Sequence, residues 1–120
     1  MLAFHNMVGT LVIVGYLVVT VLYLLVSRGR DLRWARGVSF GAAALLLLQY
    51  MLGFALWGMD DYDPRTSHYV LALLALLTVG LEHGYAPTRA TPRERARYGA
   101  LASGLTFLLV VAAYIVGSSD

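Results

Sequence analysis

The sequence has no cysteine and no lysine, and it has few charged residues of any kind. The absence of cysteine excludes disulfides, cysteine-ligated zinc and iron–sulfur clusters. Charged residues make up 13% of the 120 residues and hydrophobic residues 59%, whereas a soluble domain has about 25% charged residues. The chain has more hydrophobic residues than the core of a soluble domain can bury, so we expect an integral membrane protein.

The apolar residues are collected in four stretches, at about residues 4–26, 38–59, 68–85 and 98–117. Each stretch approaches the roughly 20 residues that a helix needs to cross the hydrocarbon of a bilayer. We therefore predict an all-α integral membrane protein, a four-transmembrane up-and-down helix bundle that forms one domain over residues 1–120. Its first partner is the lipid bilayer.

The arginines predict how this bundle is oriented. Residues 28–36 and 86–97 each carry four arginines and one acidic residue, whereas residues 60–66 carry three aspartates and one arginine. Because short basic loops stay in the cytoplasm, we expect both termini outside, in the inner (cytoplasmic) membrane of a bacterial or archaeal cell. No basic segment precedes the first apolar stretch, so we expect no cleavable signal peptide. Scattered arginines and a net charge of +2 give no reason to expect a nucleic-acid partner.

Two of the three histidines begin apolar stretches. His5 and His68 begin the first and third stretches, which run in the same direction in an up-and-down bundle, so both imidazoles are expected near the outer end at similar depth. Two facing imidazoles are what a six-coordinate haem iron needs, one nitrogen from each side within a helix bundle. The alternative is that each is an interfacial histidine, half in water.

Three further polar residues within the stretches are candidates for a function. Glu82 and His83 are at the cytoplasmic end of the third stretch, and the first stretch offers no histidine to match His83, so no second bis-histidine haem is predicted. We interpret them as a pair at the level of the lipid headgroups, assisted by Arg89; a quinone or proton-uptake site is the alternative. Gln49, in the middle of the second stretch, either forms an interhelical hydrogen bond or contacts a porphyrin or a ligating histidine.

On these residues the chain resembles one four-helix half of the heme A synthase family. The matching segments are Phe-His-Asn-Met-Val-Gly around His5, Leu-Gln-Tyr-Met-Leu-Gly with Gln49 and Gly53, and Ser-His-Tyr-Val-Leu-Ala around His68. In that family each half holds a haem between two histidines near the outer face, so the resemblance implies that His5 and His68 are the axial ligands of one haem b. The catalytic half of the family has a glutamate three residues before its first histidine, where this chain has Leu2. The resemblance is therefore closer to the half that holds haem as a cofactor.

The expected function follows from this ligation. A haem with two imidazole ligands has no open coordination position and suits one-electron transfer. We predict a cytochrome b-like membrane protein that transfers electrons, or a haem-carrying subunit of a larger membrane complex. Arg65, with Thr66 and Ser67, is expected to bind the haem propionates. The acidic run at residues 60–63 either steers a soluble cytochrome c or forms a solvated loop.

Two alternatives belong to other functional classes. A homo-oligomer of this half-size chain could rebuild an eight-helix heme A synthase-like enzyme, although Leu2 replaces the catalytic glutamate and Glu82 is predicted on the opposite side of the membrane. A cofactor-free structural or assembly subunit is the other alternative. A small multidrug-resistance transporter is disfavoured, because the first stretch lacks the glutamate that such transporters need.

Overall fold

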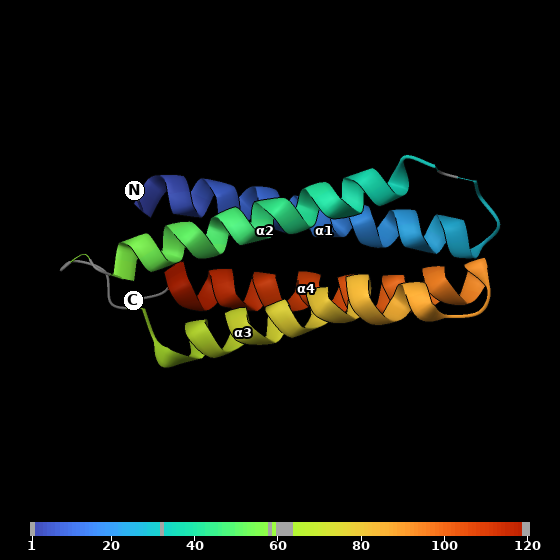
Figure 1. Ribbon diagram of the computed structural model, residues 1–120. Coiled ribbons are helices and arrows are strands. Elements are labelled where there is room, and N and C mark those ends of the chain that lie inside the picture. Colours follow the sequence, from blue (N-terminus) through green and yellow to red (C-terminus); the bar gives the residue numbers. More distant parts are fainter. Residues whose placement is uncertain (1, 32, 58, 60–63, 119–120) are drawn as a thin grey trace.

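The protein is a bundle of four long helices (Figure 1). The computed structural model describes residues 2–31, 33–57, 59 and 64–118. Over these residues every regular element is helical, and the four long helices are α1 (Leu2–Ser27), α2 (Ala35–Trp57), α3 (Thr66–Gly80) and α4 (Pro92–Ser118). Helix α3 continues into a π-helical turn, η1 (Leu81–Tyr85), and a 3-10 turn, η2 (Ala86–Thr88). All four segments, with the two turns counted to α3, are long and apolar enough to span a membrane.

Helix α4 begins six residues before the predicted start. The Thr91 hydroxyl accepts a hydrogen bond of 3.1 Å from the Glu94 backbone N–H, which caps the first turn. Pro92 occupies the first helical position, where its missing N–H costs nothing. The arginines between 93 and 97, predicted to lie in a loop, therefore lie on the first turns of α4.

The helices alternate in direction, so each end of the bundle has its own chemistry. Both termini, the end of α2 and the start of α3 lie at one end, here called the terminal end (Figure 1). The opposite end, here called the arginine end, holds the end of α1, the start of α2, both short turns and the start of α4. Helix α1 packs on α2 and α4, and α4 packs on α3. The backbones of α2 and α3 approach each other far less over the described residues.

All four helices contribute to the core, and α1, which packs against α4, contributes more of it than any other helix. Val12, Tyr16 and Val19 lie on one face of α1 at helical spacing, and each is almost completely buried. On α4, Ser103 and Thr106 are equally buried. Small and hydroxyl-bearing residues let membrane helices approach closely and bond across the interface. The interface is accordingly narrow and polar in part.

Large apolar side chains lie on the outside of the bundle. The exposed ones are spread over all four helices and include Leu11, Leu17, Leu24, Phe40, Met51, Phe54, Leu77, Leu101 and Leu108. An exposed apolar surface of this extent needs an apolar environment. The surface therefore agrees with the prediction of a lipid-facing bundle.

Helix α1 ends at a glycine. Gly29 has a φ of +96°, its N–H donates to the Val26 carbonyl at 3.0 Å, and the Arg30 N–H donates to the Leu25 carbonyl at 3.1 Å. This pair of bonds is the Schellman arrangement, in which a left-handed residue closes the last helical turn. Glycine adopts that conformation without strain.

We expect Gly29→Ala to lower the free energy of unfolding by about 1 kcal/mol, because a Cβ atom is strained at this positive φ. Gly37→Ala is the matched control, because Gly37 lies in the first turn of α2 with open space around it and alanine favours a helix. Denaturant unfolding in detergent micelles, followed by circular dichroism, measures both variants. Equal losses in the two variants would contradict the role given to Gly29.

Candidate functional site

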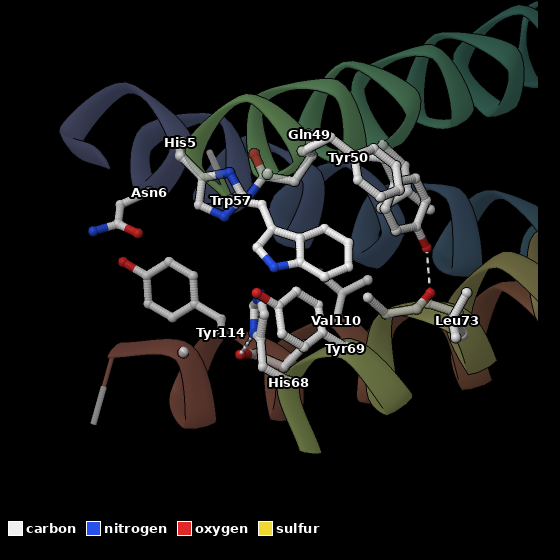
Figure 2. Close-up of a pocket in the computed structure, with 18 of the residues that line it drawn as sticks. His5, Asn6, Gln49, Tyr50, Trp57, His68, Tyr69, Leu73, Val110 and Tyr114 are labelled. Atoms are coloured by element: carbon white, nitrogen blue, oxygen red, sulfur yellow. Dashed lines mark hydrogen bonds between the residues drawn. The ribbon is translucent and has the colours of Figure 1, made fainter. Parts of the chain in front are cut away.

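A cavity of about 330 Å³ lies inside the terminal end of the bundle (Figure 2). Its volume lies at the lower end of the range of about 300–1,000 Å³ that is usual for ligand and cofactor pockets. All four helices contribute to its wall, which is mostly apolar and aromatic. The polar side chains on the wall come from His5, Asn6, Gln49, Tyr50, Trp57, His68, Tyr69 and Tyr114.

The cavity brings together the two histidines singled out in the sequence. His5, on the first turn of α1, is 6% exposed, and His68, on the first turn of α3, is half-buried. Their ring centres lie 6.4 Å apart, and their ring planes make an angle of 69°. A metal ion bound by two imidazole nitrogens on opposite sides, each at about 2 Å, separates the ring centres by about 6 Å. The separation therefore has the size that such a metal requires.

A hydrogen bond to α4 orients the His68 ring. Its Nδ1 lies 2.8 Å from the Ala113 carbonyl oxygen. Because a carbonyl only accepts hydrogen bonds, the proton is on Nδ1, and in the neutral ring Nε2 carries the lone pair. Metal-ligating histidines are generally held in the same way, by donating the other ring N–H to a carbonyl or carboxylate. His68 is thus prepared to bind a metal through Nε2.

Gln49 holds the other histidine. Its side-chain Nε2 lies 3.3 Å from Nε2 of His5, so the amide N–H donates to the ring nitrogen across the α1–α2 interface. This contact is an interhelical hydrogen bond, one of the two roles expected of Gln49, and a contact with a ligating histidine stays a prediction. Gln49 Oε1 has no hydrogen-bond partner among the described residues. A metal at Nε2 of His5 would replace the Gln49 amide in this contact.

Three glycines make room for these side chains. A Cβ atom at Gly117 would lie 2.8 Å from Nδ1 of His68, and one at Gly53 would lie 3.4 Å from Cε1 of His5. A Cβ atom at Gly9 would lie 3.0 Å from Nε2 of Gln49. The sequence analysis gave Gly117 no role. The His68 ring fits inside the bundle because α4 carries a glycine beside it, and the Gln49 amide fits because α1 carries Gly9 beside it.

Aromatic side chains bridge α2 and α3 beside the cavity. The Trp57 and Tyr69 rings lie 5.2 Å apart, and the Tyr50 hydroxyl donates to the Ala72 carbonyl (Figure 2). Sequence reasoning gave none of these residues a place at the site. The sequence indicates two of them only by position, since Tyr50 follows Gln49 and Tyr69 follows His68.

The outer loop contributes less to the described site than predicted. Arg65 immediately precedes α3 with extended backbone angles; it is exposed and is not part of the cavity wall. Thr66 and Ser67 are exposed. Contact of these three residues with haem propionates stays a prediction. The acidic run at residues 60–63, expected either to steer a cytochrome c or to form a solvated loop, lies outside the described residues.

At the arginine end the structure adds the face that Glu82 occupies. This residue is 1% exposed and points into the bundle, whereas its level relative to the lipid headgroups stays a prediction. Its Oε2 accepts hydrogen bonds from the Tyr23 hydroxyl at 2.9 Å and from the Ser39 hydroxyl, and His83 Nε2 lies 3.4 Å from it. Glu82 is buried because it lies four residues after Thr78, on the same buried face of the helix.

The predicted assistance from Arg89 is also absent from this cluster. The Arg89 guanidinium lies 4.4 Å from the centre of the Tyr85 ring and 5.9 Å from that of Tyr98, a cation–π arrangement. Among the described residues no group of three or more histidine, aspartate or glutamate side chains is placed to hold a metal ion. A metal at either end would therefore depend on two protein ligands and on a cofactor.

Comparison with protein families, with curated proteins and with solved structures gives no match to this chain. The resemblance to one half of the heme A synthase family therefore depends on the short segments around His5, Gln49 and His68 alone.

We expect Gly117→Ala to displace the His68 ring and break its bond to Ala113, because the new Cβ atom would overlap Nδ1. Two-dimensional ¹H–¹⁵N spectra of the histidine side chains should show the Nδ1-protonated form of His68 in the parent and its loss in the variant. Gly41→Ala, with nothing within 4 Å of the new atom, is the control and should leave the spectrum unchanged. An unchanged His68 signal in Gly117→Ala would contradict the assigned orientation.

Proposed function

We propose that the chain is a haem b-binding membrane protein in which His5 and His68 hold one haem between them. The single observation that carries the proposal is that two histidines 63 residues apart lie across one cavity with their ring centres 6.4 Å apart. The resemblance to the cofactor half of the heme A synthase family supports the same pair. The proposed role is one-electron transfer, or carrying haem as a subunit of a larger membrane complex.

The residues around the histidines fit such a cofactor. His68 offers Nε2 because its Nδ1 is bonded to Ala113, and Gly117 leaves the space that the His68 ring occupies. The wall around the two rings is mostly apolar, as a porphyrin requires. Trp57 and Tyr69 supply flat surfaces on the α2–α3 side, where the helices are least tightly packed.

Each side chain has a defined task in this proposal. His5 and His68 bind and orient the cofactor, Ala113 fixes the proton on His68, and Arg65 neutralises propionates beyond the start of α3. A haem with two imidazole ligands supplies one-electron transfer, since no coordination position remains for oxygen. The acidic run at residues 60–63 is the proposed docking segment for a soluble cytochrome c.

The composition of the wall favours holding haem over oxidising it. Among the described residues, no aspartate or glutamate lines the cavity, and Leu2 is part of the wall. The alternative of a half-size enzyme that acts as an oligomer requires a carboxylate from elsewhere. Conversion of haem O to haem A in a strain that lacks its own synthase would establish that alternative.

The same proposal places the protein in the cytoplasmic membrane of a bacterium or archaeon, with both termini outside. The exposed apolar side chains on all four helices support a lipid environment. Eight of the nine arginines lie at the arginine end, which supports a cytoplasmic location for that end. The haem would then lie near the outer face.

The absence of cysteine allows this orientation to be tested with single labels. Ser67→Cys and Ala90→Cys place exposed thiols at the terminal end and the arginine end respectively. A membrane-impermeant maleimide should label Ser67→Cys in intact cells and Ala90→Cys only after permeabilisation. The reverse pattern would overturn the proposed orientation.

Purified from haem-replete cells, the protein is expected to be red, with a Soret band and sharp α and β bands in its reduced-minus-oxidised spectrum. His5→Ala and His68→Ala should each lose the low-spin spectrum, because each removes one proposed axial ligand. His83→Ala is the matched control at the opposite end of the bundle and should retain it. An unchanged spectrum in either of the first two variants, or a colourless parent protein, would refute the proposal; the colourless result would favour a cofactor-free structural subunit.

A further inference from the structure

A second cavity, of about 260 Å³, lies at the arginine end. It shares no lining residue with the first cavity. Most of its wall is apolar, with side chains such as Val26, Phe40, Pro87 and Ala96. Apolar cavities of about 150 Å³ are large enough to bind benzene. This cavity therefore has room for one substituted ring.

The carboxyl group of Glu82 is the most buried polar group on that wall. Its Oε2 accepts the Tyr23 and Ser39 hydroxyls, whereas its Oε1 is buried and has no hydrogen-bond partner among the described residues. A buried acceptor without a donor is costly, by about 1–3 kcal/mol, and more if it is charged. Oε1 is therefore an acceptor that a ligand with a hydrogen-bond donor would satisfy.

Flat groups form one side of the cavity. The Phe40 and His83 rings are stacked, with centres 5.0 Å apart and an angle of 28° between their planes. The Arg36 guanidinium also lies over the Phe40 ring, 5.4 Å from its centre. Aromatic ligands pack well against such surfaces. The shape of the wall thus favours a planar ring.

Charge narrows the choice of ligand further. Arg36 and Arg95 both line the cavity, so a cation would be repelled on entry. An anionic ligand placed against Glu82 would be repelled whenever the Glu82 carboxyl group is ionised. A neutral donor avoids both penalties. Phe40 is half-exposed on the outer surface, so a ligand dissolved in the apolar phase could reach this wall.

We propose that the arginine-end cavity binds a neutral hydroxylated aromatic ring of the hydroquinone class. One ring hydroxyl donates to Oε1 of Glu82, and the ring lies against Phe40 and His83. The site lies at the opposite end of the bundle from the histidine pair, and its occupancy does not depend on haem.

The first test compares two forms of one ring with the purified protein in detergent. Equilibrium dialysis under anaerobic conditions measures the affinities for duroquinol and for duroquinone. We expect duroquinol to bind at least tenfold more tightly. Its hydroxyl can donate to Oε1 of Glu82, whereas the oxygens of duroquinone can only accept hydrogen bonds. Equal affinities, or tighter binding of duroquinone, would overturn the proposal.

Variants then locate the site. Glu82→Gln is expected to lower the affinity for duroquinol at least tenfold, and Glu94→Gln, at an exposed position in the first turn of α4, should leave it unchanged. Glu82 is buried, so a second test uses a variant that keeps the carboxyl group. Ala35→Leu narrows the cavity from the start of α2. If folded Ala35→Leu bound duroquinol with unchanged affinity, the assignment of the ligand to this cavity would be wrong.

His5→Ala separates this inference from the haem proposal. It removes a proposed haem ligand at the terminal end and should leave the affinity for duroquinol unchanged. Loss of duroquinol binding in His5→Ala would mean that the ring binds in the first cavity, and would overturn the assignment to Glu82.

Discussion

The close packing of α1 on α4 is the contact on which the rest of the bundle depends. Tyr16 is completely buried in the middle of this interface, and a hydrogen bond of 3.0 Å joins Thr20 to Ser103 across it. Between a membrane helix and lipid there is little hydrophobic driving force, so close van der Waals contact and such bonds hold the helices together. The filled centre separates a cavity at each end, and the two cavities differ in chemistry because each is built from different turns of the same helices.

The two ends use polar groups in opposite ways. At the terminal end two imidazole rings face each other, and each is hydrogen-bonded to an uncharged partner, Gln49 or the Ala113 carbonyl. At the arginine end a carboxyl group is held by hydroxyls, and arginines surround the cavity. Ionisable side chains inside a membrane segment are rare and usually functional. Both positions are therefore reasonable places to look for ligands.

Hydropathy and helix direction predicted the number of helices, their alternation and the shared depth of His5 and His68, because depth depends only on position along a helix. Rotation about the helix axis depends on which neighbour each face meets, and the sequence does not state it. The sequence analysis therefore gave Glu82 a level along the third stretch but no face, although its spacing from Thr78 indicates the buried face. The role of Gly117 could not be predicted, because it follows from the packing of α4 against His68, two segments that are far apart in the sequence.

The weak contact between α2 and α3 has a mechanical consequence. One hydrogen bond, from Tyr50 to Ala72, and one ring contact, between Trp57 and Tyr69, join the two helices beside the histidine cavity. The α1–α4 interface does not include these two contacts, so their loss would leave it in place. The side of the bundle between α2 and α3 is thus the one held by the fewest helix–helix contacts over the described residues.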